Sequence, residues 1–307
     1  MNSKTAPQTA KADVYARVTD RIVEDLAAGV RPWMKPWSAG HADGRISRPL
    51  RHNGTPYRGV NVLLLWGEAQ AKGFGSPSWM TYKQAQELGG QVRKGEAGSM
   101  VVYADRYTKS ETNERGEEAE REVAFMKGYT VFNVEQIDGL PAQYLAPVAP
   151  VLQPLPLHQA AEAFFTATGA TFCHGGSRAF YAPARDFIQL PPAEAFRDAE
   201  SYAATKAHEL IHWTGHPHRN AREFGRRFGD RAYAFEELVA ELGAAFLCAD
   251  LGITPEVQPD HAAYLAHWLQ VLKEDKRAIF SAAAHAQRAA DYVQALQHTD
   301  TAEHLAA

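Results

Sequence analysis

The sequence predicts an α+β protein in two parts, an N-terminal α+β domain over residues 13–140 and a mostly helical α+β domain over residues 157–307. Three patterns support this prediction. Apolar residues at helical spacing open the chain, two β-rich stretches flank a charged turn near its middle, and long helical patterns dominate its final third. The 307 residues, of which 45% are hydrophobic, suffice for two domains with cores of their own.

The first domain is predicted to begin after a polar tail, residues 1–12, which we expect to be disordered. Apolar residues recur every four positions from Val14 to Leu26, which predicts an amphipathic helix that Gly29 ends. The elements expected after it are an ordered loop over 31–58, helices over 60–72 and 82–88, and strands over 99–108 and 121–134 that pair as a long hairpin.

Five prolines between residues 141 and 156 predict an extended linker, which marks the boundary between the two domains. The second domain is predicted to open with a helix over 157–168, followed by three short strands. These strands cover 171–173, 178–181 and 187–190, and the long helices that follow cover 199–214, 233–251, 261–274 and 276–297.

Charge is unevenly distributed along the chain, although the formal net charge is only −4. Residues 1–110 hold 16 Lys and Arg against 9 Asp and Glu, whereas residues 148–307 hold 13 against 19. A basic half joined to an acidic half predicts a polyanion-binding module. Two cysteines exclude a disulfide scaffold, and no apolar run reaches the ~20 residues that span a bilayer. We therefore expect a cytoplasmic protein with no membrane partner.

Aromatic and basic residues are interleaved in the first half, as in the sequence RPWMKPW over residues 31–37. Flat rings stack on bases and cations follow phosphates, so this pattern predicts single-stranded DNA as a partner. The sequence leaves open that the tryptophans instead fill a core. The candidate DNA-binding residues are Arg31, Trp33, Lys35, Trp37, Tyr57, Arg58, Trp79, Tyr82, Lys83, Arg93 and Lys94.

The motif HELIH over residues 208–212 indicates a metal site. His208 and His212 are four residues apart, so on a helix both imidazoles point the same way and can hold one Zn²⁺. Glu209 lies beside them, where it can take a proton from a metal-bound water, which makes it the candidate catalytic residue.

The third metal ligand has three candidates, Glu237, Glu241 and His218. Glu237 and Glu241 share a face of the following helix, whereas Glu236 is turned about 100° away. We assign Glu237 to the metal and Glu241 to a position behind a ligand histidine, which it would orient. His218 completes the metzincin pattern, but metzincins need a methionine turn, and all five methionines precede the motif. Two histidines and one glutamate would bind Zn²⁺ and also accept Mn²⁺ or Co²⁺.

Stretches over roughly residues 14–300 resemble ArdC-type antirestriction proteins, a plasmid-borne family related to the N-terminal region of TraC-type conjugative primases. The matching stretches are PWMKPW, PYRGVNVLLLW, SWMTYKQAQELGGQVRKGEAGSMVVY, SRAFYAPARDFIQLP, HELIHWTGHPHR, RRFGDRAYAFEELVAELGAAFL and ADLGI. The resemblance implies a first domain that binds single-stranded DNA without strong sequence preference and a second, zincin-like metallopeptidase domain. It also implies that His208 and His212 are the ligand pair, Glu209 the catalytic acid and Glu237 the helix glutamate.

The resemblance further implies a role in conjugation, where the protein protects entering plasmid DNA from the recipient's restriction system. Three hypotheses fit this role. DNA binding alone protects; or a DNA-targeted zinc metalloprotease cleaves a host restriction-system protein; or the metal only holds helices together. An open coordination position beside an acid favours catalysis over a structural metal. A strand over 178–181 or 187–190 would pair with an extended peptide substrate, or is buried with no such role.

Overall fold

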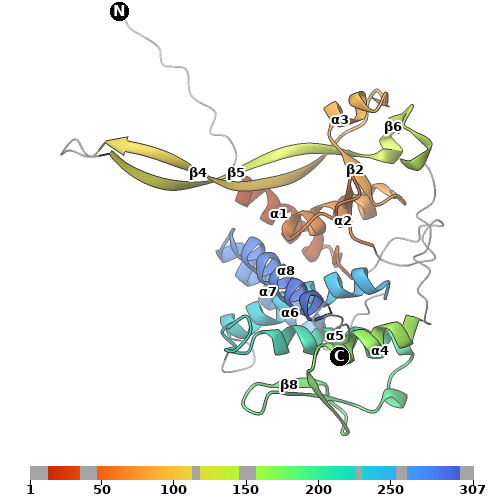
Figure 1. The fold of residues 1–307 in the computed structure, drawn as a ribbon, viewed down its shortest axis with the longest axis vertical. Coiled ribbons are helices and arrows are strands. Elements are labelled where there is room, and N and C mark those ends of the chain that lie inside the picture. Colours follow the sequence, from red (N-terminus) through yellow and green to blue (C-terminus); the bar gives the residue numbers. More distant parts are fainter. Residues whose placement is uncertain are drawn as a thin grey trace, which may run out of the picture.

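The computed structural model describes residues 13–34, 47–112, 118–144, 157–225, 230–253 and 261–297. In Figure 1 the first half of the chain lies above a bundle of helices from the second half, and the fold is α+β as predicted. The helices are α1 (Val14–Ala27), α2 (Val60–Lys72), α3 (Tyr82–Glu87), α4 (Leu157–Ala167), α5 (Ala199–Thr214), α6 (Arg231–Leu251), α7 (His261–Glu274) and α8 (Ala278–Leu296).

The first half is built on a four-stranded sheet of order β1-β2-β5-β4. Its long strands β4 and β5 run antiparallel and leave the body as a twisted ribbon (Figure 1), longer than the predicted hairpin. In a second, two-stranded sheet β3 pairs antiparallel with β6, which directly follows a short 3-10 helix at the end of β5. The strands are β1 (Leu50–Arg51), β2 (Ser78–Met80), β3 (Gln91–Val92), β4 (Ser99–Thr112), β5 (Glu118–Asn133) and β6 (Ile137–Asp138).

The second half carries a three-stranded sheet beside its helices. Its order is β7-β9-β8, with β7 (Thr171–His174) parallel to the central strand β9 (Phe187–Leu190). β8 (Phe180–Ala182) pairs antiparallel with β9 and forms an edge of the sheet. Each of these strands lies within three residues of its predicted range. No helix of the described residues is long and apolar enough to cross a membrane.

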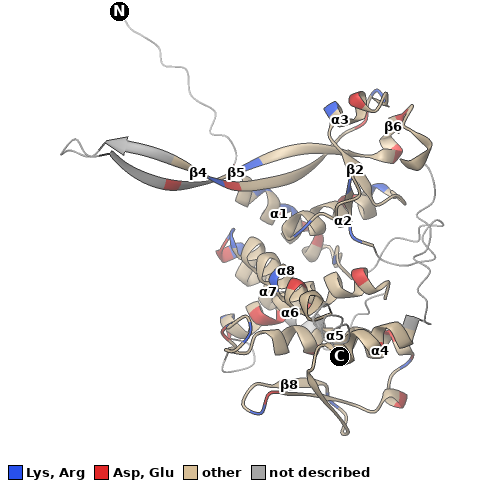
Figure 2. Ribbon diagram, viewed as in Figure 1, with Lys and Arg blue, Asp and Glu red and all other residues tan. Residues whose placement is uncertain are grey.

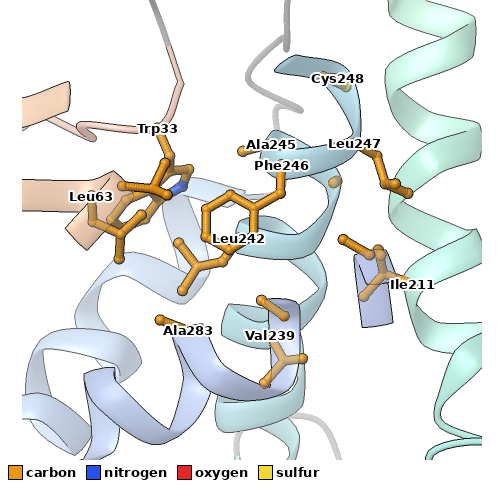
Figure 3. Close-up of a cluster of buried hydrophobic side chains, with 14 of the residues drawn as sticks. Trp33, Leu63, Ile211, Val239, Leu242, Ala245, Phe246, Leu247, Cys248 and Ala283 are labelled. Atoms are coloured by element: carbon orange, nitrogen blue, oxygen red, sulfur yellow. The ribbon is translucent and has the colours of Figure 1, made fainter. Parts of the chain in front are cut away.

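The core crosses from one half of the chain to the other. Figure 3 shows Trp33 and Leu63 from the first half facing Leu242 and Phe246 of α6. The Trp33 ring also lies 6.3 Å from Trp268 of α7, between ring centroids. A single cluster of buried apolar residues therefore links α1 and α2 to α6, α7 and α8.

Polar contacts reinforce this shared core. Arg48 is buried over the Phe246 ring, and its Nε and Nη2 donate to the two carboxylate oxygens of Asp250 at 2.6 and 2.8 Å. The Thr19 hydroxyl donates to the Lys276 carbonyl at 2.6 Å. The predicted boundary at 141–156, of which residues 145–156 lie outside the described part, thus separates segments whose packing is continuous. The predicted tail, residues 1–12, also lies outside it.

Candidate metal centre and nucleic-acid interface

Helix α5 carries the HELIH motif through the interior. The helix begins after Asp198, whose carboxylate accepts a hydrogen bond from the Ser201 backbone N–H and so caps the first turn. Residues 205–214 are all buried, which places both motif histidines away from bulk solvent. The rings of His208 and His212 lie 4.9 Å apart, as expected for positions one helical turn apart.

Helix α6 supplies a carboxylate to the same point. Glu237 Oε2 lies 3.6 Å from His208 Nε2, and Glu237 Oε1 lies 3.6 Å from His212 Nε2. Gly243 permits this approach of the two helices, because a Cβ there would lie only 2.9 Å from Ile211 side-chain atoms. The Tyr233 side chain forms a hydrogen bond to Glu237 and helps to hold it.

These three side chains fit a divalent metal ion. Donor atoms of His208, His212 and Glu237 all lie within 4.8 Å of one another. Donors about 2.0–2.2 Å from one ion in tetrahedral geometry lie about 3.3–3.6 Å apart, close to the two distances to Glu237. Two imidazoles and one carboxylate leave a fourth position open, as in catalytic rather than structural zinc sites. The structure thus brings together the three residues predicted as ligands, whereas His218 is exposed beside His216.

Glu236 orients His212, a role that the sequence reasoning missed. Its Oε1 lies 3.1 Å from His212 Nδ1, on the side of the ring opposite the metal position. Arg222 donates to both carboxylate oxygens of Glu236, from Nε at 2.9 Å and from Nη2 at 2.8 Å. All three side chains are buried. Arg222 also donates to the Thr214 hydroxyl and the Ile211 carbonyl, which ties the pair to the end of α5.

Glu241 lies behind the other histidine, where it was predicted. Its Oε2 is 3.8 Å from His208 Nδ1, beyond hydrogen-bond range but within that of an ion pair. Arg31, from the loop after α1, places Nη1 4.0 Å from Glu241 Oε1. The first half of the chain therefore reaches to within two side chains of the metal position.

Glu209 is buried next to the two histidines. Burial raises the pKa of its carboxyl, while the nearby histidines and a hydrogen bond from the Tyr181 backbone N–H lower it, with a net rise. Tyr181 lies in β8, so the edge strand of the small sheet holds the candidate catalytic acid. Asp186 anchors this strand, since it accepts hydrogen bonds from the Tyr181 hydroxyl at 2.8 Å and from Arg219.

In the metal-free protein, the charges within the site favour a protonated His208 and an ionised Glu237. Burial opposes the charged form of His208, but its hydrogen bond to Glu237 and the surrounding carboxylates raise its pKa to about 9. Burial likewise opposes the charged form of Glu237, but the two histidines lower its pKa to about 2. Because metal binding requires a neutral imidazole, we expect His208 to lose a proton when an ion binds.

Three predicted DNA-binding residues, Trp33, Tyr57 and Trp79, are buried, and for their rings the prediction is wrong. Trp33 and Trp79 have 0% and 1% of their surface exposed, and Tyr57 has 7%. These rings cannot stack on a base because they pack inside the protein, Trp33 on Trp268 and Trp79 on Phe74. Arg31 is partly buried, with 11% of its side chain exposed, and it faces Glu241.

The other predicted DNA-binding residues at described positions are exposed, and most of their cations are paired. Arg58 contacts Asp291, Lys83 contacts Glu87, and Arg93 contacts Glu96 and Asp138. Figure 2 accordingly shows blue and red segments interspersed among the described residues. Tyr82 and Lys94 are exposed as well, while Lys35 and Trp37 lie outside the described residues.

Two protein-family models match the chain. Residues 12–132 match the N-terminal domain of anti-restriction factor ArdC, and residues 159–285 match a zincin-like metallopeptidase. The protein y4eC of Sinorhizobium fredii is 43% identical over 303 residues, which cover 97% of this chain and 96% of y4eC. The DNA primase TraC of Escherichia coli is 39% identical over 311 residues, which cover 95% of this chain but only 28% of the primase.

Two crystal structures of the antirestriction protein ArdC from the R388 plasmid have the same fold. The metal-free structure is 47% identical with a TM-score of 0.77, over 92% of this chain and 97% of that one. The Mn(II)-bound structure is 46% identical with a TM-score of 0.75, over 94% and 99%. With these likenesses along nearly its whole length, the chain belongs to the ArdC family of antirestriction proteins, and its second half is a zincin-like metallopeptidase domain.

Proposed function

We propose that this chain is a plasmid-borne antirestriction protein that binds single-stranded DNA non-specifically and protects entering conjugative DNA from host restriction. We further propose that His208, His212 and Glu237 hold a divalent ion, Zn²⁺ or alternatively Mn²⁺ or Co²⁺, with Glu209 as the catalytic residue. The observation that supports the metal site is that three buried side chains, His208, His212 and Glu237, converge on one point. A further buried acid, Glu209, lies beside them. The Mn(II)-bound structure of the R388 protein supports it.

The site has the parts that peptide hydrolysis needs. A divalent ion, when bound, supplies a Lewis acid that acidifies water and polarises a carbonyl. Glu209 has a raised pKa, which brings its carboxyl nearer to the neutral range where it can both accept and return a proton. Glu236 holds the His212 ring from behind, so that Nε2 keeps its direction.

The edge strand β8 is the natural place for a peptide substrate. It runs past Glu209, which accepts a hydrogen bond from its backbone, and within the small sheet it pairs only with β9 among the described strands. An extended peptide could add to such an edge by main-chain hydrogen bonds. A host restriction-system protein is the substrate that this role would require.

Conjugative plasmid transfer into a restricting recipient tests the proposal. The comparison is between wild type, Glu209→Gln and a control, Glu194→Gln, whose side chain is exposed in the short 3-10 helix before α5. All three must first show equal folding, metal content and oligonucleotide affinity. If wild type gives no protection, the antirestriction role is wrong. If wild type and Glu209→Gln protect equally, DNA binding is the protective activity.

The second candidate function is a metalloprotease whose proteolysis is itself the main activity. The buried position of Glu209 between the ligand histidines and β8 favours it over a purely structural metal. In that case Glu209→Gln loses protection while its metal content and its DNA affinity stay at wild-type level. A protein with only a structural metal would instead lose its fold with the metal and be indifferent to Glu209→Gln.

A further inference from the structure

Burial of the predicted tryptophans raises the question of which rings could meet a base. Stacking requires an aromatic face that is open to solvent. Among the described residues, the exposed large apolar side chains are Tyr82, Tyr103, Tyr129 and Phe180. Tyr103 and Tyr129 have the greatest exposure, 49% and 45%, and both lie on the β4–β5 ribbon.

The register of the ribbon puts these two rings on one face. Tyr103 is opposite Lys127, and the flanking pairs are Val101 with Tyr129 and Asp105 with Phe125. Because paired residues point to the same side of a sheet and alternate along each strand, all these odd-numbered residues share a face. We call Tyr103, Phe125, Lys127 and Tyr129 the aromatic face of the ribbon.

The members of the aromatic face touch one another. The Tyr103 ring lies 6.2 Å from both Phe125 and Tyr129, measured between centroids, and Lys127 Nζ lies 5.2 Å from the Phe125 ring. The Tyr103 hydroxyl donates to Asp105 at 2.5 Å, which fixes the direction of the ring. The result is a row of rings held in place by neighbours but still half open to solvent.

We propose that the aromatic face of the ribbon is the surface on which bases of single-stranded DNA stack. This inference rests on the proposed single-stranded DNA binding and names its contact site. An aromatic ring contacts the face of a base and not its hydrogen-bonding edge. Stacking on such rings therefore tolerates any base sequence, as the proposed non-specific binding requires. The ribbon also projects from the body (Figure 1), so a strand of DNA can reach it without displacing packed elements.

The charges on and beside the aromatic face determine where the phosphates of a bound DNA strand would lie. Lys127 is its one cation, and the Asp105 carboxylate lies on the same side with a pKa lowered by its hydrogen bonds from the Tyr103 hydroxyl and the Arg106 backbone. The phosphates of a bound strand are therefore attracted by Lys127 and repelled by Asp105. In this arrangement the bases, and not the phosphates, contact Tyr103 and Tyr129. We expect Lys127→Ala to reduce the salt dependence of binding by about one phosphate contact.

The test is the affinity of the full chain for a fluorescein-labelled oligothymidylate, measured by fluorescence anisotropy at low salt. Stacking on an aromatic side chain contributes roughly 5- to 150-fold in affinity per base. Tyr103→Ala and Tyr129→Ala should each weaken binding by such a factor. Tyr103→Phe keeps the ring and should bind like wild type. Thr108→Ala, an exposed change on the other face of β4, should also bind like wild type.

The outcomes separate this inference from the function beneath it. If wild type fails to bind the oligonucleotide, the proposed DNA binding is wrong and the contact site falls with it. If wild type binds and the double variant Tyr103→Ala/Tyr129→Ala binds equally well, the aromatic face is not the contact site, although DNA binding stands. Both tyrosines are half exposed, so unchanged circular dichroism and thermal midpoints are expected and exclude misfolding as the cause.

Discussion

Replacing Glu236 by glutamine removes one negative charge from behind His212 while keeping the size of the side chain. In the wild type this carboxylate accepts from Arg222 at 2.8 and 2.9 Å and lies 3.1 Å from His212 Nδ1. Glutamine offers one acceptor oxygen in place of two, so Arg222 and His212 compete for it. The variant therefore disturbs both the orientation of the His212 ring and the buried ion pair between Arg222 and Glu236.

Two magnitudes follow from this geometry. The side chains of Arg222 and Glu236 are only 3% and 4% exposed, so their pair is in the class where loss of one partner costs about 3–5 kcal/mol of unfolding free energy. Loss of a group that orients a metal-ligating histidine weakens metal affinity by about 10- to 100-fold. We expect both effects in Glu236→Gln.

Two measurements separate these effects. Urea unfolding of the metal-free protein gives the stability, and titration with Mn²⁺ followed by electron paramagnetic resonance gives the affinity. The double variant Arg222→Met/Glu236→Leu removes the buried charges, so it should recover much of the stability while its metal affinity stays low. The orienting role of Glu236 is refuted if Glu236→Gln binds Mn²⁺ as tightly as wild type.

Two further predictions concern stability. Arg48→Ala leaves Asp250 without its buried guanidinium and should cost about 3–5 kcal/mol in urea unfolding, whereas Arg231→Ala, whose side chain is 60% exposed, should cost at most about 1 kcal/mol; equal losses would contradict this. The pKa of Asp186 is lowered, chiefly by its hydrogen bond from Arg219, so its stabilisation is present above the unfolded pKa near 3.9 and lost as pH falls below it. The unfolding midpoints of wild type and Asp186→Asn should therefore differ at pH 7 and converge as the pH falls through the lowered folded-state pKa; a constant gap would refute this assignment.

Local patterns were enough to predict most elements. The four-residue spacing from Val14 to Leu26 and the glycine after Lys72 correspond to helices that end where expected. The β4–β5 ribbon extends beyond its predicted range because antiparallel pairing continues into charged residues, which the β-propensity pattern does not mark as strand. The longer elements were thus predictable from short windows of sequence, whereas the strands β1, β2, β3 and β6, each of two or three residues, were not predicted.

The site was predictable where it depends on one helix and less so where it depends on two. His208, Glu209 and His212 follow from helical spacing alone. Helical spacing gives Glu236 no role at the metal, because it points about 100° away from Glu237, but an imidazole ring has two nitrogens. Two adjacent residues of α6 therefore contact the two nitrogens of His212: Glu237 lies near Nε2 and Glu236 lies near Nδ1. A histidine that binds a metal through Nε2 usually has an acid or carbonyl at Nδ1, and this pattern is the sequence signal for Glu236.

The tryptophan prediction failed for a different reason. A ring beside cations has the same local sequence whether it faces solvent or a distant helix. What buries Trp33 is Trp268, more than 200 residues later in the chain, and no window of sequence contains both. Arg31 depends on a similarly remote partner, Glu241. Burial decided by such long-range contacts becomes visible only in the folded structure.

The core shared by both halves bears on how such a protein can be rearranged in evolution. A gene fusion that moved only the first half would expose the apolar sides of α1 and α2, and one that moved only the second would expose α6 to α8. We therefore expect the two halves of the chain to be transferred together when such genes fuse. The primase TraC fits this expectation, since a stretch amounting to 28% of its length matches 95% of this chain, both halves in order.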